Sequence, residues 1–345
     1  MNKSSVIGLD LAKNVFQIHG VDSDGEVVVR KQLKRSQMRQ FFANLEPCLI
    51  GMEACGGAHY WSRELSGFGH TVRMMAPVFV KPYLKSNKND RNDAEAICEA
   101  VQRPSMRFVQ PKRPEQQAVL HLHHGRRLLV RQRVALSNHM RGILSEYGMV
   151  LPQGVKVIPR RLPVILEDGD NEVPMLARHL LAEFKAQYDE LIERIDRIEQ
   201  QIKAWHAKDA VSQRLANIPG IGVLTATALA ATVGEGQDFS HGRQLAAYLG
   251  LVPRQASSGG KERLLGISKR GDGYLRQLLI HGARAVIHHI RRRLKAGRPS
   301  GNPWLEQLLQ RCHVNEAAVA LANKMARMAW VLVARHETYR PARLV

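Results

Sequence analysis

Hydrophobic and polar residues alternate along the first third of the chain in the way that β-strands require. The apolar run SVIGLDLA ends shortly after Asp10, and the alternating stretches NVFQIHGV and EVVVRKQL flank the turn sequence DSDG. Alternation with a period of two places successive side chains on opposite faces of a sheet. We therefore predict a three-stranded meander, with turns near Lys13 and at Asp22–Gly25.

A second pattern follows, in which short apolar runs alternate with amphipathic stretches. Residues 36–45 and the segment GGAHYWSRELSGFG have helical spacing, whereas CLIGMEA, which leads to Glu53, and HTVRMMAP are typical of short buried strands. A meander followed by helix, strand, helix and strand is the order of a ribonuclease-H-like sheet. We predict an α/β domain over residues 1–110, in which the first and fourth strands are neighbours.

The middle of the chain changes to helical periodicity. Glu115–Tyr147 is a basic helix, residues 148–163 form a linker rich in helix breakers, and a heptad seam of apolar residues extends from Phe184 to Trp205. Such a seam favours a partner helix. The partner is either the Glu115–Tyr147 helix, in an intramolecular hairpin, or a second chain in a coiled coil, and both alternatives stay open. We assign residues 111–208 to this helical, coiled-coil spacer.

Residues 209–345 are predicted to form a mostly α-helical C-terminal domain. It begins near NIPGIG and an alanine-rich helix, which is the pattern of a helix-hairpin-helix element. The amides of Gly220 and Gly222 are then candidates for binding a phosphate at the start of the next helix. A plain connection between two helices has the same short sequence, and this alternative stays open.

The composition adds a strong charge imbalance. The 345 residues include 51 Lys and Arg against 31 Asp and Glu, a formal net charge of +20. This excess favours a polyanionic partner, because cations placed on phosphates release condensed counterions. We find no uninterrupted apolar run of about 18 residues and no secretory signal, so we expect a cytoplasmic protein without a membrane partner. Cys48, Cys55, Cys98 and Cys312 lack zinc spacing and are expected to be reduced thiols.

Four carboxylates are candidates for a metal site. Asp10 ends the first strand, Glu53 ends the fourth, and Asp90 and Asp93 share one face at the start of a helix. If that helix crosses the end of the sheet, four oxygen donors meet, which suits two Mg²⁺ ions about 4 Å apart acting on a phosphodiester. Each residue alone also fits a structural role as a turn, strand-end or helix-dipole acid, and both interpretations stay open.

Two other chemistries agree less well with these carboxylates. GLDLAKN also resembles the first phosphate loop of actin-like ATPases, but the sequence has no second Asp-Gly-rich loop and no Walker A pattern. A carboxylate pair for glycoside hydrolysis agrees poorly with a net charge of +20. The cations Lys85, Lys88 and Arg91 surround Asp90 and Asp93, and we predict that they contact phosphates.

The segment LAAYLGLVPRQASSGGKERLLGISKRGDGYLRQLL contains a serine-glycine loop in basic surroundings. Ser257 and Ser258 directly precede Gly259 and Gly260. Such a loop is usually only a turn, and no Ser-His-Asp order indicates a triad. Nearby cations could instead hold a phosphodiester while a serine oxygen attacks it. The predicted nucleic-acid contacts here are Arg254, Lys261, Arg263, Lys269 and Arg276.

With these motifs the sequence resembles a known family, the DEDD transposases of bacterial insertion sequences. The shared motifs, in chain order, are GLDLAKN, MEACGG, KNDRNDAEAI, LGLVPRQASSGGKERLLGISKRGDGYLR and ALANKMARMAW. The first three carry Asp10, Glu53, Asp90 and Asp93, and together the motifs span nearly the whole chain. The resemblance implies a RuvC-like N-terminal domain and a C-terminal transposase domain with a serine nucleophile.

The resemblance also implies a mechanism and partners. The DEDD carboxylates would bind Mg²⁺, and Ser258 would attach covalently to a DNA end, although a shift by one residue to Ser257 stays open. A structured bridge RNA (also called a seek RNA) would guide recombination by pairing with donor and target DNA. Family members act as homo-oligomers, here a dimer or tetramer, in which the DEDD domain of one subunit meets the serine domain of another. Such a bacterial protein would work at the nucleoid.

Two alternative functions stay open at this point. The chain could be a metal-only nuclease of the Holliday-junction type, in which water is the nucleophile. It could also be a non-enzymatic nucleic-acid-binding protein with structural carboxylates, which predicts salt-dependent binding without Mg²⁺ dependence.

Overall fold

The structure is a computed structural model that describes residues 4–84 and 89–340, with the side chain of Asp90 also left undescribed. The chain divides into two compact units, Met1–Arg113 and Pro114–Val345. Each unit has a hydrophobic core of its own. The spacer predicted over residues 111–208 lies in the second unit, apart from residues 111–113.

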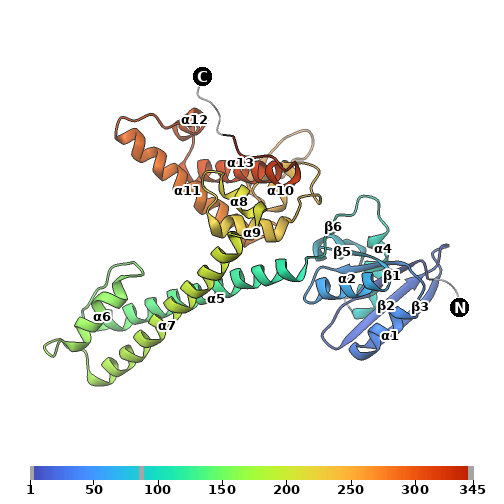
Figure 1. The fold of residues 1–345 in the computed structure, drawn as a ribbon, viewed down its shortest axis with the longest axis horizontal. Coiled ribbons are helices and arrows are strands. Elements are labelled where there is room, and N and C mark those ends of the chain that lie inside the picture. The colour runs from blue at the N-terminus through green and yellow to red at the C-terminus, as the bar shows by residue number, and fades with distance from the viewer. Residues whose placement is uncertain (1–3, 85–88, 341–345) are drawn as a thin grey trace. The chain divides into compact units, whose positions relative to one another are not determined.

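The first unit is built on a six-stranded sheet. Its strands are β1 (Val6–Asp10), β2 (Val15–Val21), β3 (Val27–Lys34), β4 (Leu49–Glu53), β5 (Thr71–Met75) and β6 (Phe108–Val109). Their order is β3-β2-β1-β4-β5-β6 (Figure 1). β1 pairs antiparallel with β2 and parallel with β4. The expected α/β sheet, with its first and fourth strands adjacent, is confirmed.

Both predicted turns of the meander are present. The first joins β1 to β2 across residues 11–14, and the second joins β2 to β3. In the second turn, Asp22 Oδ1 accepts hydrogen bonds from the backbone N–H groups of Asp24 and Glu26, both at 3.0 Å. Gly25 has a φ of +86°, which a glycine adopts without strain. The DSDG sequence therefore specifies this turn locally.

Helices cover both faces of this sheet. α1 (Met38–Ala43), preceded by the 3₁₀ turn η1 (Arg35–Gln37), and α2 (Ala58–Gly67) pack on one face. On that face the Phe16 ring meets the Trp61 ring edge-on, with centroids 5.4 Å apart. α4 (Asp90–Val101) covers the other face, next to α3 (Pro77–Val80) and the turn η2 (Lys81–Tyr83).

α4 approaches β1 so closely that the contact requires a glycine. A Cβ atom at Gly8 would overlap the carbonyl oxygen of Ala94 and lie 2.5 Å from the backbone nitrogen of Cys98. The Cys98 thiol also donates to the carbonyl oxygen of Val6, at 3.9 Å. Because a later residue of α4 lies near the start of β1, the first turn of α4 is directed toward the end of β1, where Asp10 lies.

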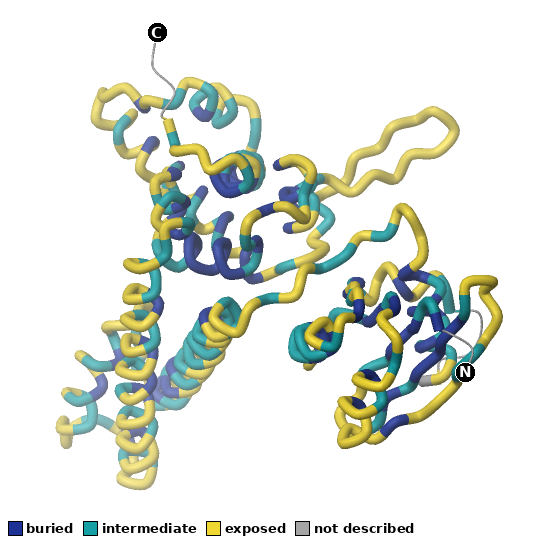
Figure 2. Tube along the Cα trace, turned by 45° about the vertical axis from the view of Figure 1, so that its right-hand side comes forward, coloured by how far each residue is buried: buried dark blue, intermediate teal, exposed yellow. Residues whose placement is uncertain are grey.

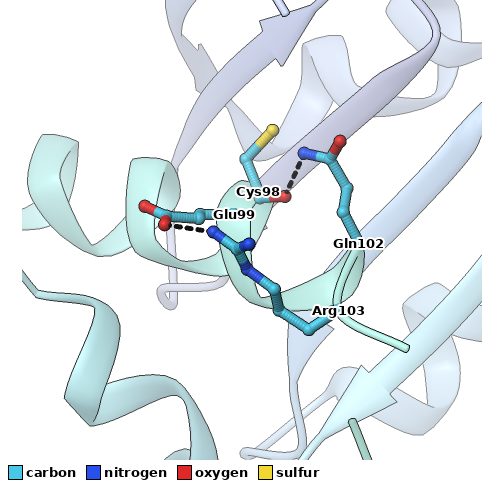
Figure 3. Close-up of polar contacts among 4 residues, drawn as sticks. All are labelled: Cys98, Glu99, Gln102 and Arg103. Carbon is cyan, nitrogen blue, oxygen red and sulfur yellow. Dashed lines mark hydrogen bonds and ion pairs between the residues drawn. The ribbon is translucent and has the colours of Figure 1, made fainter. Parts of the chain in front are cut away.

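The last turn of α4 is held by side chains near its surface (Figure 3). Arg103 and Glu99 form an ion pair at 2.6 Å, and Gln102 Nε2 donates to the Cys98 carbonyl oxygen at 2.8 Å. An exposed ion pair with i,i+4 spacing contributes only about 0.3–0.5 kcal/mol. The position of α4 therefore depends mainly on its buried packing against the sheet, which includes the contact with Gly8.

The second unit begins with two long helices that lie side by side (Figure 1). They are α5 (Pro114–Glu146) and α7 (Met175–His206), with the shorter α6 (Val157–Glu167) between them in sequence. Tyr188 of α7 packs with Leu144 of α5 in a shared core, and Arg126 pairs with Glu199 at 2.7 Å. The apolar seam of α7 thus contacts α5 of the same chain, which is the intramolecular alternative.

The rest of the second unit is mostly helical, as expected. Its elements are α8 (Ala210–Ala216), α9 (Val223–Val233), α10 (Gly242–Tyr248), β7 (Pro253–Gln255), β8 (Leu264–Ile267), α11 (Gly273–Lys295), α12 (Pro303–Arg311) and α13 (Val314–Ala334). Among the described helices, α13 alone is long and apolar enough to cross a membrane, but 56% of its apolar window is buried inside the unit. It packs against α10 and α11 as a core helix.

A buried polar network connects α5 to the helical core. His123 of α5 is fully buried, with Nδ1 3.0 Å from Tyr274 Oη and Nε2 2.9 Å from Thr227 Oγ1. Burial, followed by the positive charge of Arg126, lowers the pKa of His123 to about 4. The ring is therefore neutral at pH 7, and a neutral imidazole supplies one donor and one acceptor for the two hydroxyls.

We expect Gly8→Ala to destabilise the first unit by about 3 kcal/mol, because the added methyl group overlaps the backbone of α4. Amide hydrogen exchange in β1 and β4 measures this loss. Gly67→Ala is the matched control, since a Cβ atom at Gly67 meets no atom within 4 Å. Equal protection in the two variants would contradict the close contact.

We expect acid to weaken the second unit through His123. Its unfolded-state pKa is about 6.5, so below that pH the unfolded chain gains a proton that the folded chain excludes until about pH 4. The stabilisation that neutral His123 provides is complete well above pH 6.5. About 2 kcal/mol of the free energy of unfolding is lost between pH 7.5 and pH 5.

Amide exchange of α9 and α11 at the two pH values tests this expectation. His123→Gln should flatten the pH dependence, whereas the control His121→Gln, which changes an exposed histidine of the same helix, should retain it. A His123→Gln variant with the unchanged pH dependence would show that another group is responsible.

Candidate functional site

Asp10 and Glu53 lie at the same edge of the sheet. They are the last residues of the parallel neighbours β1 and β4, whose register pairs Leu9 with Met52 immediately before them. Adjacent strands are about 4.8 Å apart, and both residues are half-buried. The strand register therefore places these two carboxylate residues next to each other.

Asp90 and Asp93 lie in the first turn of α4. Asn89 caps this helix, and its side chain accepts a hydrogen bond from the N–H of Asn92 at 2.9 Å. Asp93 is half-buried and directly precedes Ala94, whose carbonyl faces β1. The packing of α4 on β1 therefore also sets the position of Asp93. For Asp90 the structure describes the backbone alone, as the first residue of the helix.

The carboxylates of Glu53 and Asp10 affect the pKa of the Cys55 thiol. Its pKa is raised by desolvation and, next in size, by the negative charges of Glu53 and Asp10. Two charges that act on one sulfur must both lie near it, which agrees with the strand register. A raised pKa keeps this exposed thiol protonated at neutral pH, so it is a poor nucleophile and a poor metal ligand.

Asp10 and Glu53 end neighbouring strands, but the described carboxylates do not form a metal site. With the side chain of Asp90 outside the search, no group of three or more described His, Cys, Asp or Glu side chains is arranged to hold a metal ion. Carboxylates such as those of Asp10, Glu53 and Asp93 are nevertheless the ligands that Mg²⁺ prefers. A divalent cation would offset the repulsion between them, so the donor set fits such an ion. The four-carboxylate site stays a prediction.

Of the three cations predicted beside Asp90 and Asp93, the structure describes one. Arg91 is exposed in the first turn of α4, whereas Lys85 and Lys88 lie outside the described residues. The helix dipole disfavours a cation at a helix start. Arg91 thus adds little to the stability of α4, and its contact with a phosphate stays a prediction.

The serine pair lies at the tip of a β-hairpin formed by β7 and β8. Ser258 and Lys261 form a bridge, in which the Lys261 N–H donates to the Ser258 carbonyl at 3.0 Å. Gly259 and Gly260 between them have φ values of +56° and +78°, as in a two-residue type I′ turn. Residues 253–266 are all exposed, and Figure 2 shows this hairpin in yellow, projecting from the helical unit.

The hydroxyl groups of the two serines are in different states. Ser257 Oγ accepts a hydrogen bond from the backbone N–H of Arg263 at 3.2 Å, which ties it to the opposite strand. Within residues 4–84 and 89–340, the Ser258 hydroxyl makes no hydrogen bond. Ser258 therefore offers the free oxygen.

Close contacts hold the base of the hairpin. Arg276 Nη1 donates to the carbonyl oxygens of Leu249 at 2.9 Å and of Arg270 at 2.8 Å. A Cβ atom at Gly250 would overlap the Arg270 carbonyl, and Gly250 has a φ of +68°. Arg276 thus has a structural role in linking the segments before and after the hairpin. Its contact with nucleic acid stays a prediction.

The other predicted cations of this segment lie on the hairpin or just after it. Arg254, Lys261 and Arg263 are exposed, and no ion pair to a described residue neutralises them. Lys269 follows β8, and its backbone N–H donates to the Gly250 carbonyl at 3.2 Å. The hairpin therefore combines a free hydroxyl with unneutralised positive charge, which suits a phosphate.

The turn between α8 and α9 contains Gly220 and Gly222. A Cβ atom at Gly220, which has a φ of +90°, would lie 2.9 Å from the Gly282 carbonyl oxygen and from Met325 Cε. Close packing against α11 and α13 therefore accounts for a glycine at position 220. This agrees with the alternative that the turn is a plain connection between two helices. Gly222 is exposed at the N-cap of α9, and phosphate binding at this turn stays a prediction.

Three features that support these positions were absent from the predictions. The Gly8 contact had a signal, since a glycine inside a strand often marks a close backbone approach. The effect of the Glu53 charge on the pKa of Cys55 could have been expected, because Cys55 lies two residues after Glu53. The pairing of His123 with Tyr274, which are 151 residues apart, has no local signal, because neither segment carries information about the other.

Comparisons with known proteins match both units. A family model for DEDD transposases of the IS110 type, described as "Transposase", matches residues 7–149. A second, described as "Transposase IS116/IS110/IS902 family", matches residues 212–298. The first range contains the four carboxylates, and the second contains Ser258.

Similar proteins extend over almost the same length. A "Probable family 20 transposase" of Pseudomonas aeruginosa is 53% identical, over 98% of this chain and 99% of its own length. The transposase for insertion sequence element IS1111A of Coxiella burnetii is 46% identical, over 99% and 92%. The transposase for IS1328 of Yersinia enterocolitica is 45% identical, over 96% and 97%.

We expect Mg²⁺ to stabilise the first unit and Asp10→Asn to abolish this effect. An ion that binds only the folded state adds about 1.4 kcal/mol at ten times its Kd. Thermal unfolding with and without Mg²⁺ measures the shift.

Asp24→Asn is the control for this experiment. It removes the same charge from an exposed turn of the same unit and should leave the Mg²⁺ response unchanged. An equal Mg²⁺ shift in the Asp10→Asn variant would exclude Asp10 as a ligand.

Proposed function

Because this chain belongs to the IS110/IS116 family of insertion-sequence transposases, we propose that it recombines DNA by linking a DNA end covalently to Ser258. Its relatives are transposases, and the similarity to this chain covers nearly their whole length. Transposition of DNA is therefore the activity of the family. The covalent step, its metal and its guide are the parts that we propose.

The observation that carries the proposal is the free hydroxyl of Ser258 at the exposed tip of the hairpin. Its neighbour Ser257 is already an acceptor for the Arg263 N–H, so Ser258 is the better nucleophile of the pair. Hairpin cations can hold a phosphodiester next to this oxygen and reduce the charge that repels the attack.

The covalent step is a displacement at phosphorus. Ser258 Oγ forms a bond to the phosphorus while the bond from phosphorus to the leaving sugar oxygen breaks. The Ser258 proton passes to solvent water during the attack, and the leaving sugar oxygen takes one proton from solvent to end as a hydroxyl, so the protons balance. The energy of the phosphodiester is kept in the serine ester, so strand exchange can follow without another energy source.

The carboxylates contribute to this step by holding divalent metal. Membership of a DEDD family suggests divalent metal use, and we propose that Asp10, Glu53, Asp90 and Asp93 hold Mg²⁺, two ions per site. Bound Mg²⁺ would stabilise the negative charge that develops on the phosphoryl oxygens. The ends of β1 and β4 and the start of α4, which carry these four residues, support this part of the proposal.

We further propose that a structured RNA guides the reaction and that two or four copies act together. The net charge of +20 supports several nucleic-acid partners. The α7 seam contacts α5 of its own chain, so contacts between copies would use other surfaces. We place the reaction at the bacterial nucleoid in the cytoplasm, and the RuvC-like identity of the N-terminal sheet is part of the same proposal.

We expect Ser258→Ala to abolish a covalent protein–DNA adduct while DNA binding persists. The adduct is a band on a denaturing gel that disappears after protease treatment. Ser257→Ala is the matched control and should retain most of the adduct, since it loses only a hydrogen bond within the hairpin.

The other outcomes identify the alternatives. An adduct that survives in Ser258→Ala but not in Ser257→Ala would move the nucleophile by one residue. Mg²⁺-dependent cleavage without any protease-sensitive band would favour water as the nucleophile. Full strand exchange by Asp10→Ala would remove the carboxylates from the reaction.

A further inference from the structure

A shallow, open cleft of about 640 Å³, with a mostly apolar surface, lies in the first unit beside the β1–β2 turn. It is lined by Asn14, Val15, Lys34, Arg35 and Ser36. Val15 pairs with Lys34 in the sheet, and the Arg35 N–H donates to the Asn14 carbonyl at 2.9 Å. The cleft is therefore formed by the start of β2 and the end of β3, which the backbone holds together.

This cleft lies at the edge of the sheet that carries the carboxylates. β1 ends at Asp10, which faces Gln17 of β2, and residues 11–14 form the turn beyond that edge. Asn14 is the last residue of the turn, and Val15 is the first residue of β2. Consider a DNA strand with one phosphate at Asp10 and Glu53. A neighbouring phosphate on one side of it would then lie close to the cleft.

Exposed cations line the cleft and its rim. Lys13, Lys34 and Arg35 are exposed, and none forms an ion pair with any residue that the structure describes. Nearby Arg39, in contrast, pairs with Glu64 at 2.6 Å. Positive charge without a counter-ion, beside carboxylates that repel DNA, provides the attraction that a phosphate backbone needs at this edge.

Arg35 is held in place before any ligand binds. Its guanidinium lies over the Trp61 ring, 5.4 Å from the centroid, and Nη1 donates to the Lys13 carbonyl at 3.3 Å. Trp61 is buried in α2, which follows β4 in the chain. A side chain fixed in this way loses less conformational entropy on binding than a free surface arginine.

We propose that this cleft binds the sugar–phosphate backbone of a DNA strand, at a phosphate that flanks the one at the carboxylates. Lys34 and Arg35 neutralise that phosphate, and Lys13 adds charge at the rim. The contact is with the backbone, so it positions the strand without reading its sequence. The assignment to DNA rests on the proposed function, since it assumes that the carboxylate edge acts on DNA.

The test measures DNA binding by the full chain at several salt concentrations. Fluorescence anisotropy with a labelled duplex, in EDTA so that no strand is cut, gives the slope of log K against log salt. Each lost phosphate contact reduces the magnitude of this slope by about 0.9. We expect that reduction in slope for Lys34→Ala and for Arg35→Ala. The reduction should be the same with a duplex of unrelated sequence. The charge-conserving Lys34→Arg should show no reduction.

Arg103→Ala is the matched control, because it removes an exposed cation that is already paired with Glu99. Its slope should equal that of the unchanged protein. Unchanged slopes for both Lys34→Ala and Arg35→Ala would overturn the proposal, as would a reduction seen with a structured RNA and not with DNA. Cleavage and the Ser258 adduct play no part in this readout, so its failure is separate from failure of the proposed function.

Discussion

Direct backbone contact between α4 and β1 determines the geometry of the carboxylate edge. Because Gly8 has no side chain, the backbone at Ala94 and Cys98 can touch the strand, and the start of α4 is directed toward the end of β1. Any larger residue would lift the helix and move Asp93 with it. The packing contact at Gly8 thus helps to set where the residues of α4 lie relative to the end of β1.

Local patterns in the sequence predict the elements well, and contacts between distant segments remain beyond their reach. The DSDG turn and the adjacency of β1 and β4 follow from turn chemistry and strand order, and both are present. The sequence left open whether the α7 seam faces α5 or another chain, because a heptad pattern shows an apolar face and not its partner. It also left open whether Ser258 or Ser257 is the nucleophile, since the hydrogen bond between Ser257 and Arg263 exists only once the hairpin has formed.

The hairpin that carries Ser258 combines a fixed base with an exposed tip. Arg276 and Gly250 hold the base to the helical core, and the His123–Tyr274 pair fixes the start of α11 just beyond it. At the tip, backbone hydrogen bonds and the I′ turn are the main constraints. Segments with few buried contacts open at low cost, so the tip can adapt to a ligand while the core keeps its packing.

The two outer strands of the six-stranded sheet, β3 and β6, are poor templates for additional strands. β6 has two residues, and β3 carries Arg30, Lys31 and Lys34 along its exposed length. A short edge offers few backbone groups, and a charged edge brings like charges together when two copies meet. When copies of the chain meet, such edge strands protect them from merging into continuous β-structure and aggregating.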